Sequence, residues 1–298
     1  MAQDPYYRQM LEWSKQQAAQ QAQRQQEQVN IQRVNEERER LRREHLERTR
    51  IYEAQTLATA ASSAAAGAGG GGNRTPEEDT SSTGTVTFNG IDQYIEAPNA
   101  QVVTWLPGTA SFTIEWFMKK GDGGSAFPRV FSLGFDQGAT IGCSIEEGTC
   151  YIWPYGGSLS GSMPTGYDDG SSWTHIAISR SGTNTRLFID GSLKMTKTSD
   201  NRNINDSINP GFNLNMGVDD PTAGAGANWW SGQLTNFRWD NSAVYTGTFS
   251  VPTSPLTQLA NTKLLMLGGN QTNPVVDSTG VNTLQNYGST WSPNTPFV

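Results

Sequence analysis

The segment that follows residue 85 limits most strongly what this chain can fold into. Short runs rich in Val, Ile, Thr, Phe, Tyr and Trp alternate there with clusters of Gly, Asp, Asn, Ser and Pro. The runs predict strands and the clusters predict turns, and Asp190–Gly191 is the strongest hairpin signal. Many short strands without a helical pattern predict an all-β antiparallel sandwich or barrel, and about 210 residues suit one large sandwich. The candidate strands are 85–88, 93–96, 112–119, 128–134, 139–145, 149–154, 173–180, 184–189, 192–197, 211–217, 231–239 and 263–267.

The first 60 residues have a different character. Residues 6–60 contain neither Pro nor Gly and are rich in Gln, Glu, Arg and Ala, which favour helix. We therefore predict a long polar α-helix over residues 1–60. Its apolar positions are too sparse for a regular coiled-coil seam, which leaves two alternatives. It is a solvated single helix, or, as we favour, it anchors the chain by packing against copies of itself or a larger assembly. The predicted contact residues are Tyr6, Tyr7, Met10, Trp13, Ile31, Val34 and Leu41.

Residues 61–84 join the predicted helix to the predicted sandwich. Ala, Ser and Gly dominate this stretch, including a run of Gly, and such a composition is typical of flexible linkers. The expected organisation is a helix over 1–60, a linker over 61–84 and a β-sandwich over 85–298.

The charge of the chain argues against some partners. The net charge is −7, and the first 55 residues hold ten Lys and Arg against nine Asp and Glu, so the acidity belongs to the rest. An acidic surface repels phosphate backbones, and we expect no nucleic-acid binding. No apolar stretch approaches the ~18 residues of a membrane span, and the N-terminus lacks the apolar core of a signal peptide. We expect a chain made in a cytoplasm and not inserted in a membrane.

The two cysteines, Cys143 and Cys150, flank a predicted turn. They could face each other across a hairpin, so a disulfide is geometrically open. Free thiols are the favoured alternative, because nothing else in the sequence suggests export.

The order of local patterns in the second part resembles the concanavalin A-like lectin/glucanase superfamily, in particular its laminin-G-like jelly rolls. Residues 88–98 look like the family's opening strand pair, and Ser-Phe-Thr-Ile-Glu-Trp-Phe at 111–117 looks like the next strand. The most specific match is Trp-Thr-His-Ile-Ala-Ile-Ser-Arg at 173–180, followed by Thr-Arg-Leu-Phe-Ile-Asp-Gly at 185–191. The resemblance covers about 85–285 and implies a jelly-roll sandwich.

Three residues within these patterns are expected to serve the fold. Trp116 and Trp173 lie in alternating strands, which indicates core positions. His175 lies between apolar residues of a strand, and we interpret it as a structural histidine.

The resemblance also bears on catalysis. Glycosidases of this fold carry acidic residues at alternating positions of one strand, which brings them together on one face. The acidic pairs at 146–147, 168–169 and 219–220 are instead adjacent and fall in predicted turns and loops. We therefore predict a protein that is not an enzyme.

Binding is the alternative that the residues favour. Lectin-like members of the family bind sugars on aromatic side chains next to hydrogen-bonding groups. The candidates here are Trp153, Tyr155, Tyr167, Trp229 and Asn228, with Trp229 expected to point outward and Trp230 inward. Packing under a loop is the alternative for each aromatic residue.

Calcium is the one cofactor candidate. Calcium takes carboxylate and carbonyl oxygens, and Asp219 and Asp220 in a Gly-rich loop offer them. Asp168 and Asp169 in the loop 166–170 come second. Adjacent Asp residues are also ordinary turn formers, and this alternative stays open.

The functional hypothesis combines these parts. The segment 245–252 resembles the closing segment of lectin-like domains in virion proteins of phages and large viruses. We therefore predict a virion structural protein whose helix binds other virion proteins or forms a homo-oligomer. Its sandwich is expected to be displayed for attachment to a cell-surface glycan. One alternative is a capsid or tail decoration protein without a ligand, and another is a cellular lectin or glycosidase.

Overall fold

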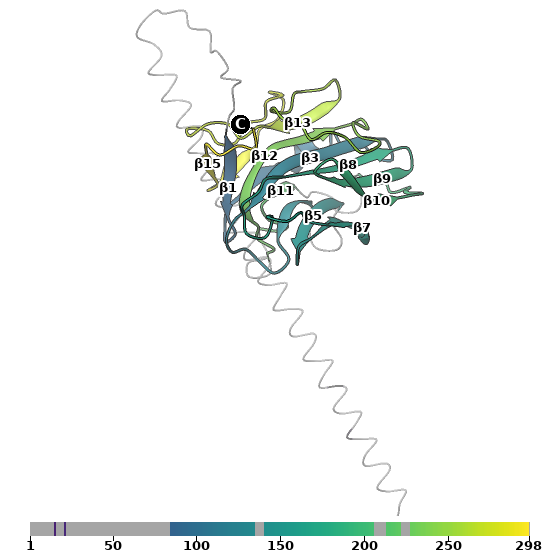
Figure 1. Ribbon diagram of the computed structural model, residues 1–298, viewed down its shortest axis with the longest axis horizontal. Coiled ribbons are helices and arrows are strands. Elements are labelled where there is room, and N and C mark those ends of the chain that lie inside the picture. The colour runs from purple at the N-terminus through teal and green to yellow at the C-terminus, as the bar shows by residue number, and fades with distance from the viewer. Residues whose placement is uncertain are drawn as a thin grey trace, which may run out of the picture. The chain divides into compact units, whose positions relative to one another are not determined.

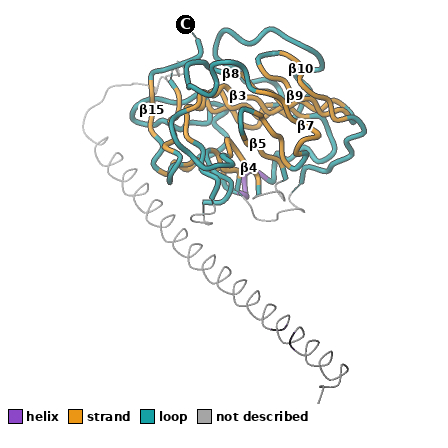
Figure 2. The backbone as a smooth tube through the Cα atoms, turned by 60° about the horizontal axis from the view of Figure 1, so that its bottom comes forward, coloured by secondary structure: helices purple, strands orange, loops and turns teal. Residues whose placement is uncertain are grey.

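A computed structural model describes residues 84–134, 140–205, 213–221 and 227–297, together with Lys15 and Gln21. The predicted helix over 1–60, the linker over 61–84 and the expected contact residues Tyr6, Tyr7, Met10, Trp13, Ile31, Val34 and Leu41 otherwise lie outside the described residues. From residue 84 onward the chain forms two antiparallel sheets that pack face to face, which confirms the expected sandwich (Figures 1 and 2).

The first layer, sheet A, has eight strands in the order β10-β9-β8-β3-β12-β1-β15, and β13 also pairs with β12. These strands are β1 (Thr85–Asn89), β3 (Phe112–Lys120), β8 (Thr174–Ser181), β9 (Asn184–Ile189), β10 (Ser192–Lys197), β12 (Ser231–Asp240), β13 (Thr262–Met266) and β15 (Thr290–Ser292).

The second layer, sheet B, has seven strands in the order β14-β2-β11-β4-β5-β6-β7. These strands are β2 (Tyr94–Ala97), β4 (Arg129–Leu133), β5 (Ile141–Glu146), β6 (Thr149–Trp153), β7 (Gly156–Ser162), β11 (Leu214–Met216) and β14 (Gln285–Tyr287). A one-turn helix, α2 (Asn99–Val102), follows β2. Every predicted strand is present, whereas β7, β14, β15 and α2 were not predicted.

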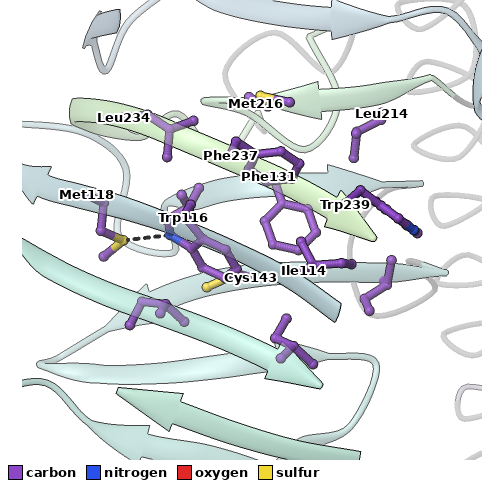
Figure 3. Close-up of a cluster of buried hydrophobic side chains, with 14 of the residues drawn as sticks. Ile114, Trp116, Met118, Phe131, Cys143, Leu214, Met216, Leu234, Phe237 and Trp239 are labelled. Atoms are coloured by element: carbon purple, nitrogen blue, oxygen red, sulfur yellow. Dashed lines mark hydrogen bonds between the residues drawn. The ribbon is translucent and has the colours of Figure 1, made fainter. Parts of the chain in front are cut away.

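The core lies between the two sheets and follows the alternation of the strands. Ile114, Trp116 and Met118 point inward from β3 and are fully buried, and Figure 3 shows Phe131 of sheet B facing them. The indole Nε1 of Trp116 donates to the sulfur of Met118 at 3.1 Å. The core position of Trp116 is thereby confirmed. Trp173 was also expected in the core, but it precedes β8 by one residue and is only half-buried.

The two cysteines belong to this core. Cys143 and Cys150 are fully buried and are not joined by a disulfide; their sulfurs lie 3.6 Å apart across the β5–β6 hairpin. Burial raises the pKa of Cys143, so this thiol stays protonated and packs as a small apolar group.

A β-bulge in β12 sets which of its side chains enter the core. The pairing with β3 shifts between Thr235 and Arg238, and Asn236 within the bulge has a φ of 54°. Asn tolerates this left-handed conformation better than most residues. Because the bulge reverses the alternation, Phe237 and Trp239 point into the core and Arg238 points to the outer face of sheet A.

The outer face of sheet A carries a buried ionic cluster. Glu115 accepts hydrogen bonds from Nε and Nη2 of Arg238, from Nε2 of His175 at 3.1 Å and from the hydroxyl of Tyr245 at 2.8 Å. Burial alone would raise the pKa of Glu115, but the hydrogen bond from His175 and the charge of Arg238 outweigh it and lower the pKa. The cluster fastens the segment 241–261, which contains Tyr245, over sheet A. His175 therefore has the structural contacts expected of it.

Candidate functional site

A pocket of about 200 Å³ lies at one end of the sandwich, where strands of the two sheets end. We call this end, formed by the segments 121–128, 147–148, 163–173, 217–221 and 227–230, the pocket end. The charged and aromatic residues that line the pocket are Lys120, Glu147, Tyr167, Asp168 and Trp230. Pockets for drug-sized ligands usually span about 300 to 1,000 Å³, so this one suits a single ring or a small group.

The strand pairing explains why these residues meet. Lys120 ends β3 and pairs with Gly232, so it lies next to the start of β12. Trp230 immediately precedes this strand. Glu147 and Gly148 form the turn of the β5–β6 hairpin, with positive φ values of 47° and 71°, and this turn closes the pocket from sheet B. Tyr167 comes from the loop before β8.

The mouth of the pocket is charged. Nζ of Lys120 lies 3.3 Å from Oδ1 of Asp168 and 5.7 Å from the centre of the Tyr167 ring. The Asp168 side chain is 73% exposed, and the exposed Glu147 adds a second carboxylate. One ammonium and two carboxylates leave the mouth with a net negative charge, and they can both donate to and accept from hydroxyl groups.

The inner part of the pocket is apolar, with two polar atoms. Trp230 is 1% exposed and Tyr167 is 2% exposed. Nε1 of Trp230 is enclosed and lies next to the Tyr167 hydroxyl. Burial raises the pKa of the Tyr167 hydroxyl, and the nearby Trp230 indole opposes this shift only in part. Tyr167 thus keeps its proton at neutral pH. The side chain of Ile145 and the loop residues Ala126 and Pro128 complete the lining.

An exposed aromatic side chain stands beside the pocket. Phe127 is 56% exposed and lies between the lining residues Ala126 and Pro128. Neither Phe127 nor Lys120 was among the predicted binding residues. Phe127 follows Gly-Asp-Gly-Gly-Ser-Ala, so the criterion of an aromatic residue in a turn-rich loop would have found it. No comparable signal marks Lys120, which lies at the end of a strand.

Asp219 holds two residues ahead of β12, Asp220 and Asn228. Its carboxylate accepts from the backbone N–H of Asp220 at 2.7 Å, and from the backbone N–H and the side-chain amide of Asn228 at 3.0 and 2.6 Å. The next residue, Trp229, exchanges hydrogen bonds with Ser125 at 2.9 Å in both directions. The predicted residues Asn228 and Asp219 therefore position the backbone that leads to Trp230.

This arrangement bears on the calcium prediction for Asp219 and Asp220. Asp219 is 4% exposed, and its carboxylate already accepts hydrogen bonds from three N–H groups. Asp169 of the second candidate loop accepts from the backbone of Ser171 at 2.9 Å. Among the described residues, no group of three or more His, Cys, Asp or Glu side chains could hold a metal ion. Calcium stays a prediction that this geometry does not favour.

The remaining sugar-binding candidates are spread over the domain. Of them, only Tyr167 lines the pocket. Trp229 is half-buried beside Tyr94, with ring centres 6.1 Å apart. Nε1 of Trp153 donates to Ser144 at 2.8 Å. The hydroxyl of Tyr155 donates to Asp200 at 2.7 Å, away from the pocket end. As expected, Trp230 is the buried member of its pair.

The family model described as the concanavalin A-like lectin/glucanases superfamily matches residues 89–246. A search of curated proteins found no match. No helix in the described part of the chain is long and apolar enough to cross a bilayer.

Solved structures match parts of the chain. A Bacteroides ovatus protein described as carbohydrate-binding superposes with a TM-score of 0.51 at 15% identity, over 70% of this chain and 59% of that one. A heptameric SAP-like pentraxin from Limulus polyphemus gives 0.39 at 16% identity, over 54% of this chain and 77% of its own. Mouse laminin α1 domains LG4-5 give 0.36 at 12% identity, over 57% and 46%. The chain thus spans less than two thirds of the Bacteroides protein.

Proposed function

We propose, because this chain belongs to the concanavalin A-like lectin/glucanases superfamily, that its sandwich is a carbohydrate-binding module whose ligand enters the pocket. The observation that carries the proposal is the lining of that pocket. Tyr167 and Trp230 lie almost fully buried beneath it, the exposed ring of Phe127 stands beside it, and an ion pair of Lys120 and Asp168 stands at its mouth. Sugars combine apolar C–H faces with hydroxyl groups, so a site of this mixed kind suits them.

The carboxylates at the pocket support binding rather than hydrolysis. A glycosidase needs one carboxylic acid held in an environment that disfavours its charged form. Asp168 is instead largely exposed and forms an ion pair with Lys120 at 3.3 Å. Glu147 is exposed at a hairpin turn. Neither residue has the setting of a general acid.

The wider role that we propose is host attachment by a virus particle. The N-terminal segment 1–60 would join other virion proteins, and the sandwich would present its pocket to a cell-surface glycan. The support is the resemblance of the closing segment 245–252 to virion proteins, together with a predicted helix and linker before a lectin-like domain. The competing role is that of a decoration protein without a ligand, and this role would leave the pocket without a function.

Binding to a broad glycan array tests the proposal. We expect the 298-residue chain to bind a subset of glycans and the variant Phe127→Ala to bind them more weakly. Val281→Ala, which removes another exposed apolar side chain (79% exposed, against 56% for Phe127), serves as the control. An array without any bound glycan would contradict the carbohydrate proposal, and release of free sugar would contradict its non-catalytic part.

The particle role needs a separate measurement. Antibodies against the chain should label intact virus particles purified from the source of this sequence, as seen by electron microscopy. Particles without label, in preparations where the chain is detected only in the cell fraction, would overturn the virion assignment and leave a cellular lectin.

A further inference from the structure

We propose that the ligand is a neutral oligosaccharide of at least two units, with one unit in the pocket and the next on the outer face of sheet A. This inference rests on the proposed glycan binding and names the chemical class of the ligand.

A second hollow, of about 350 Å³, lies beside the pocket. Lys120 and Ser231 line both, so the two hollows adjoin along these residues. The volume of the second falls within the range of about 300 to 1,000 Å³ that is usual for small-molecule sites. A ligand that leaves the pocket past Lys120 therefore enters a space large enough for another sugar unit.

The strand register explains what lines the second hollow. Thr87 of β1 pairs with Gln233 of β12, and Gln233 pairs with Lys119 of β3 (Figure 1). Their chain neighbours at 88, 234 and 118 are buried in the core, so alternation turns the three polar side chains to the outer face of sheet A. Side chains directly opposite on neighbouring strands lie about 5 Å apart, so a hydroxyl, an amide and an ammonium group stand in one row of about 10 Å.

The polar groups of this row can be reached by a ligand. Thr87, Lys119 and Gln233 are half-buried, and Asn294, which also lines the hollow, is exposed. Within the described part of the chain, the Thr87 hydroxyl, the Lys119 ammonium group and the Asn294 side-chain amide have no hydrogen-bond partner. Gln233 donates to Ser292 at 3.2 Å, which leaves its side-chain oxygen free to accept. Hydroxyl and amide groups both donate and accept, which suits the hydroxyl groups of a sugar.

The charges around the second hollow favour a neutral sugar. Lys119, Lys120 and Asp122 line it, and Lys120 is paired with Asp168. Two ammonium groups and two carboxylates balance each other. A sulfate or carboxylate on the ligand would meet Asp122 as well as Lys119, so a charge on the sugar adds no net attraction. The second hollow thus selects its sugar unit by hydrogen bonds.

Calorimetric titration of the full chain with sugars of one, two and three units tests the inference. The probes are the β1,4-linked oligomers of glucose, xylose, mannose and galactose, and fragments of one to three units of any other glycan that binds on the array. In a series that binds, the two-unit sugar is expected to bind about tenfold more tightly than the one-unit sugar, through its hydrogen bonds to the second hollow. The third unit should change the affinity by less than about twofold, since both hollows are then filled.

Two substitutions assign this gain to the row. Lys119→Met keeps the length of the side chain and removes the ammonium group, and Thr87→Val removes a hydroxyl at nearly constant shape. Each should reduce the gain from the second unit to about threefold or less and leave the affinity for the one-unit sugar unchanged.

Lys197→Met is the matched control. Lys197 is half-buried like Lys119 and also lies in sheet A. The register across β10, β9 and β8 leads from Lys197 to the first residue of β3, whereas Lys119 is the last but one. This variant should retain the full gain.

A further pair of sugars tests the neutral class. The disaccharide of galacturonic acid carries two carboxylates, and its methyl ester carries none. We expect the acid to bind no more tightly than the ester.

The outcomes separate the inference from the proposed function. A gain from the second unit that Lys119→Met or Thr87→Val reduces and Lys197→Met retains supports it. Equal affinity for one and two units, or a gain that both substitutions leave intact, overturns the inference while the glycan proposal stands. Tighter binding of the galacturonate than of its ester overturns the neutral class. Failure to bind any glycan, on the array or in solution, overturns both.

Discussion

Lys120 and Asp168 form the charged contact at the mouth of the pocket. Substitution of a single residue, Asp168, tests whether this contact takes part in binding. The ion pair is exposed and contributes at most about 1 kcal/mol to stability. We therefore expect Asp168→Asn to leave thermal unfolding nearly unchanged and to weaken glycan binding about tenfold, since a charged hydrogen-bond acceptor is lost. The neighbouring exposed residue Asp169, which does not line the pocket, gives the control Asp169→Asn. Equal weakening in both variants would contradict a role for Asp168 at the mouth.

Glu115 makes the stability of the domain depend on pH. Its pKa is lower in the folded chain than the usual 4.5, so the stabilisation it provides is present above that value. This stabilisation is lost as the pH falls through the folded pKa. At pH 7, Glu115→Gln leaves Arg238 buried without its charge partner, and we expect a loss of about 3 to 5 kcal/mol. Urea unfolding of both chains between pH 7 and pH 3 should show this difference shrinking below about pH 4.5.

A second buried carboxylate changes the stability of the domain with pH in the opposite direction. The unfolding experiment must therefore compare the two chains rather than follow the stability of one. Burial raises the pKa of Glu96, opposed by a hydrogen bond from Asn213, so its protonation favours the folded chain at acid pH. The difference between Glu115→Gln and the unmodified chain cancels this effect, whereas the total stability does not. A difference that stays constant down to pH 3 would show that Glu115 is not the titrating group.

At the scale of elements, the hairpin turns before and after β9 offer a matched comparison. Gly182 and Gly191 both have positive φ values, 58° and 70°. A Cβ at Gly182 would meet nothing within 4 Å, whereas one at Gly191 would lie 2.1 Å from the carbonyl oxygen of Phe249. Gly182→Ala should cost about 1 kcal/mol through backbone strain alone. Gly191→Ala should cost about 3 kcal/mol, because it also displaces the segment over sheet A. Chemical denaturation that gives equal costs would contradict that contact.

The elements also show what the sequence could predict. Strands with β-branched and aromatic residues were predicted almost to their ends, because propensity and pairing agree there. The strand β7, Gly-Gly-Ser-Leu-Ser-Gly-Ser, has the composition of a loop, and its pairing with β6 overrides that composition. The bulge at Asn236 was equally hidden, since nothing in the local sequence requires the shift that turns Arg238 outward.

The residues that line the pocket could be predicted only in part, because some of them meet only through the pairing of strands. Tyr167 was selected because an aromatic residue in a polar loop is visible in the sequence alone. Lys120 and Trp230 become pocket residues only because β3 and β12 pair in antiparallel order and bring one strand's end to the other's start. Such a meeting depends on strand order in the sheet, which local patterns do not encode.

At the scale of the whole molecule, the prediction concerns how many pockets act together. A pocket of about 200 Å³ contacts little more than one sugar, so each head is expected to bind weakly. If the segment 1–60 assembles copies of the chain, several heads can engage one surface at once. Linked binding then exceeds the affinity of a single head by about 10² to 10⁴ without any new contact.

Light scattering and surface binding together test this account. We expect the full chain to have a mass in solution that is a multiple of 32.4 kDa. We also expect it to dissociate far more slowly from a dense glycan surface than from a sparse one, where only one head can bind. A mass of 32.4 kDa with equal dissociation from both surfaces would contradict self-assembly. Attachment would then depend on the number of chains that a particle carries, because a single weak site does not hold a particle to a cell.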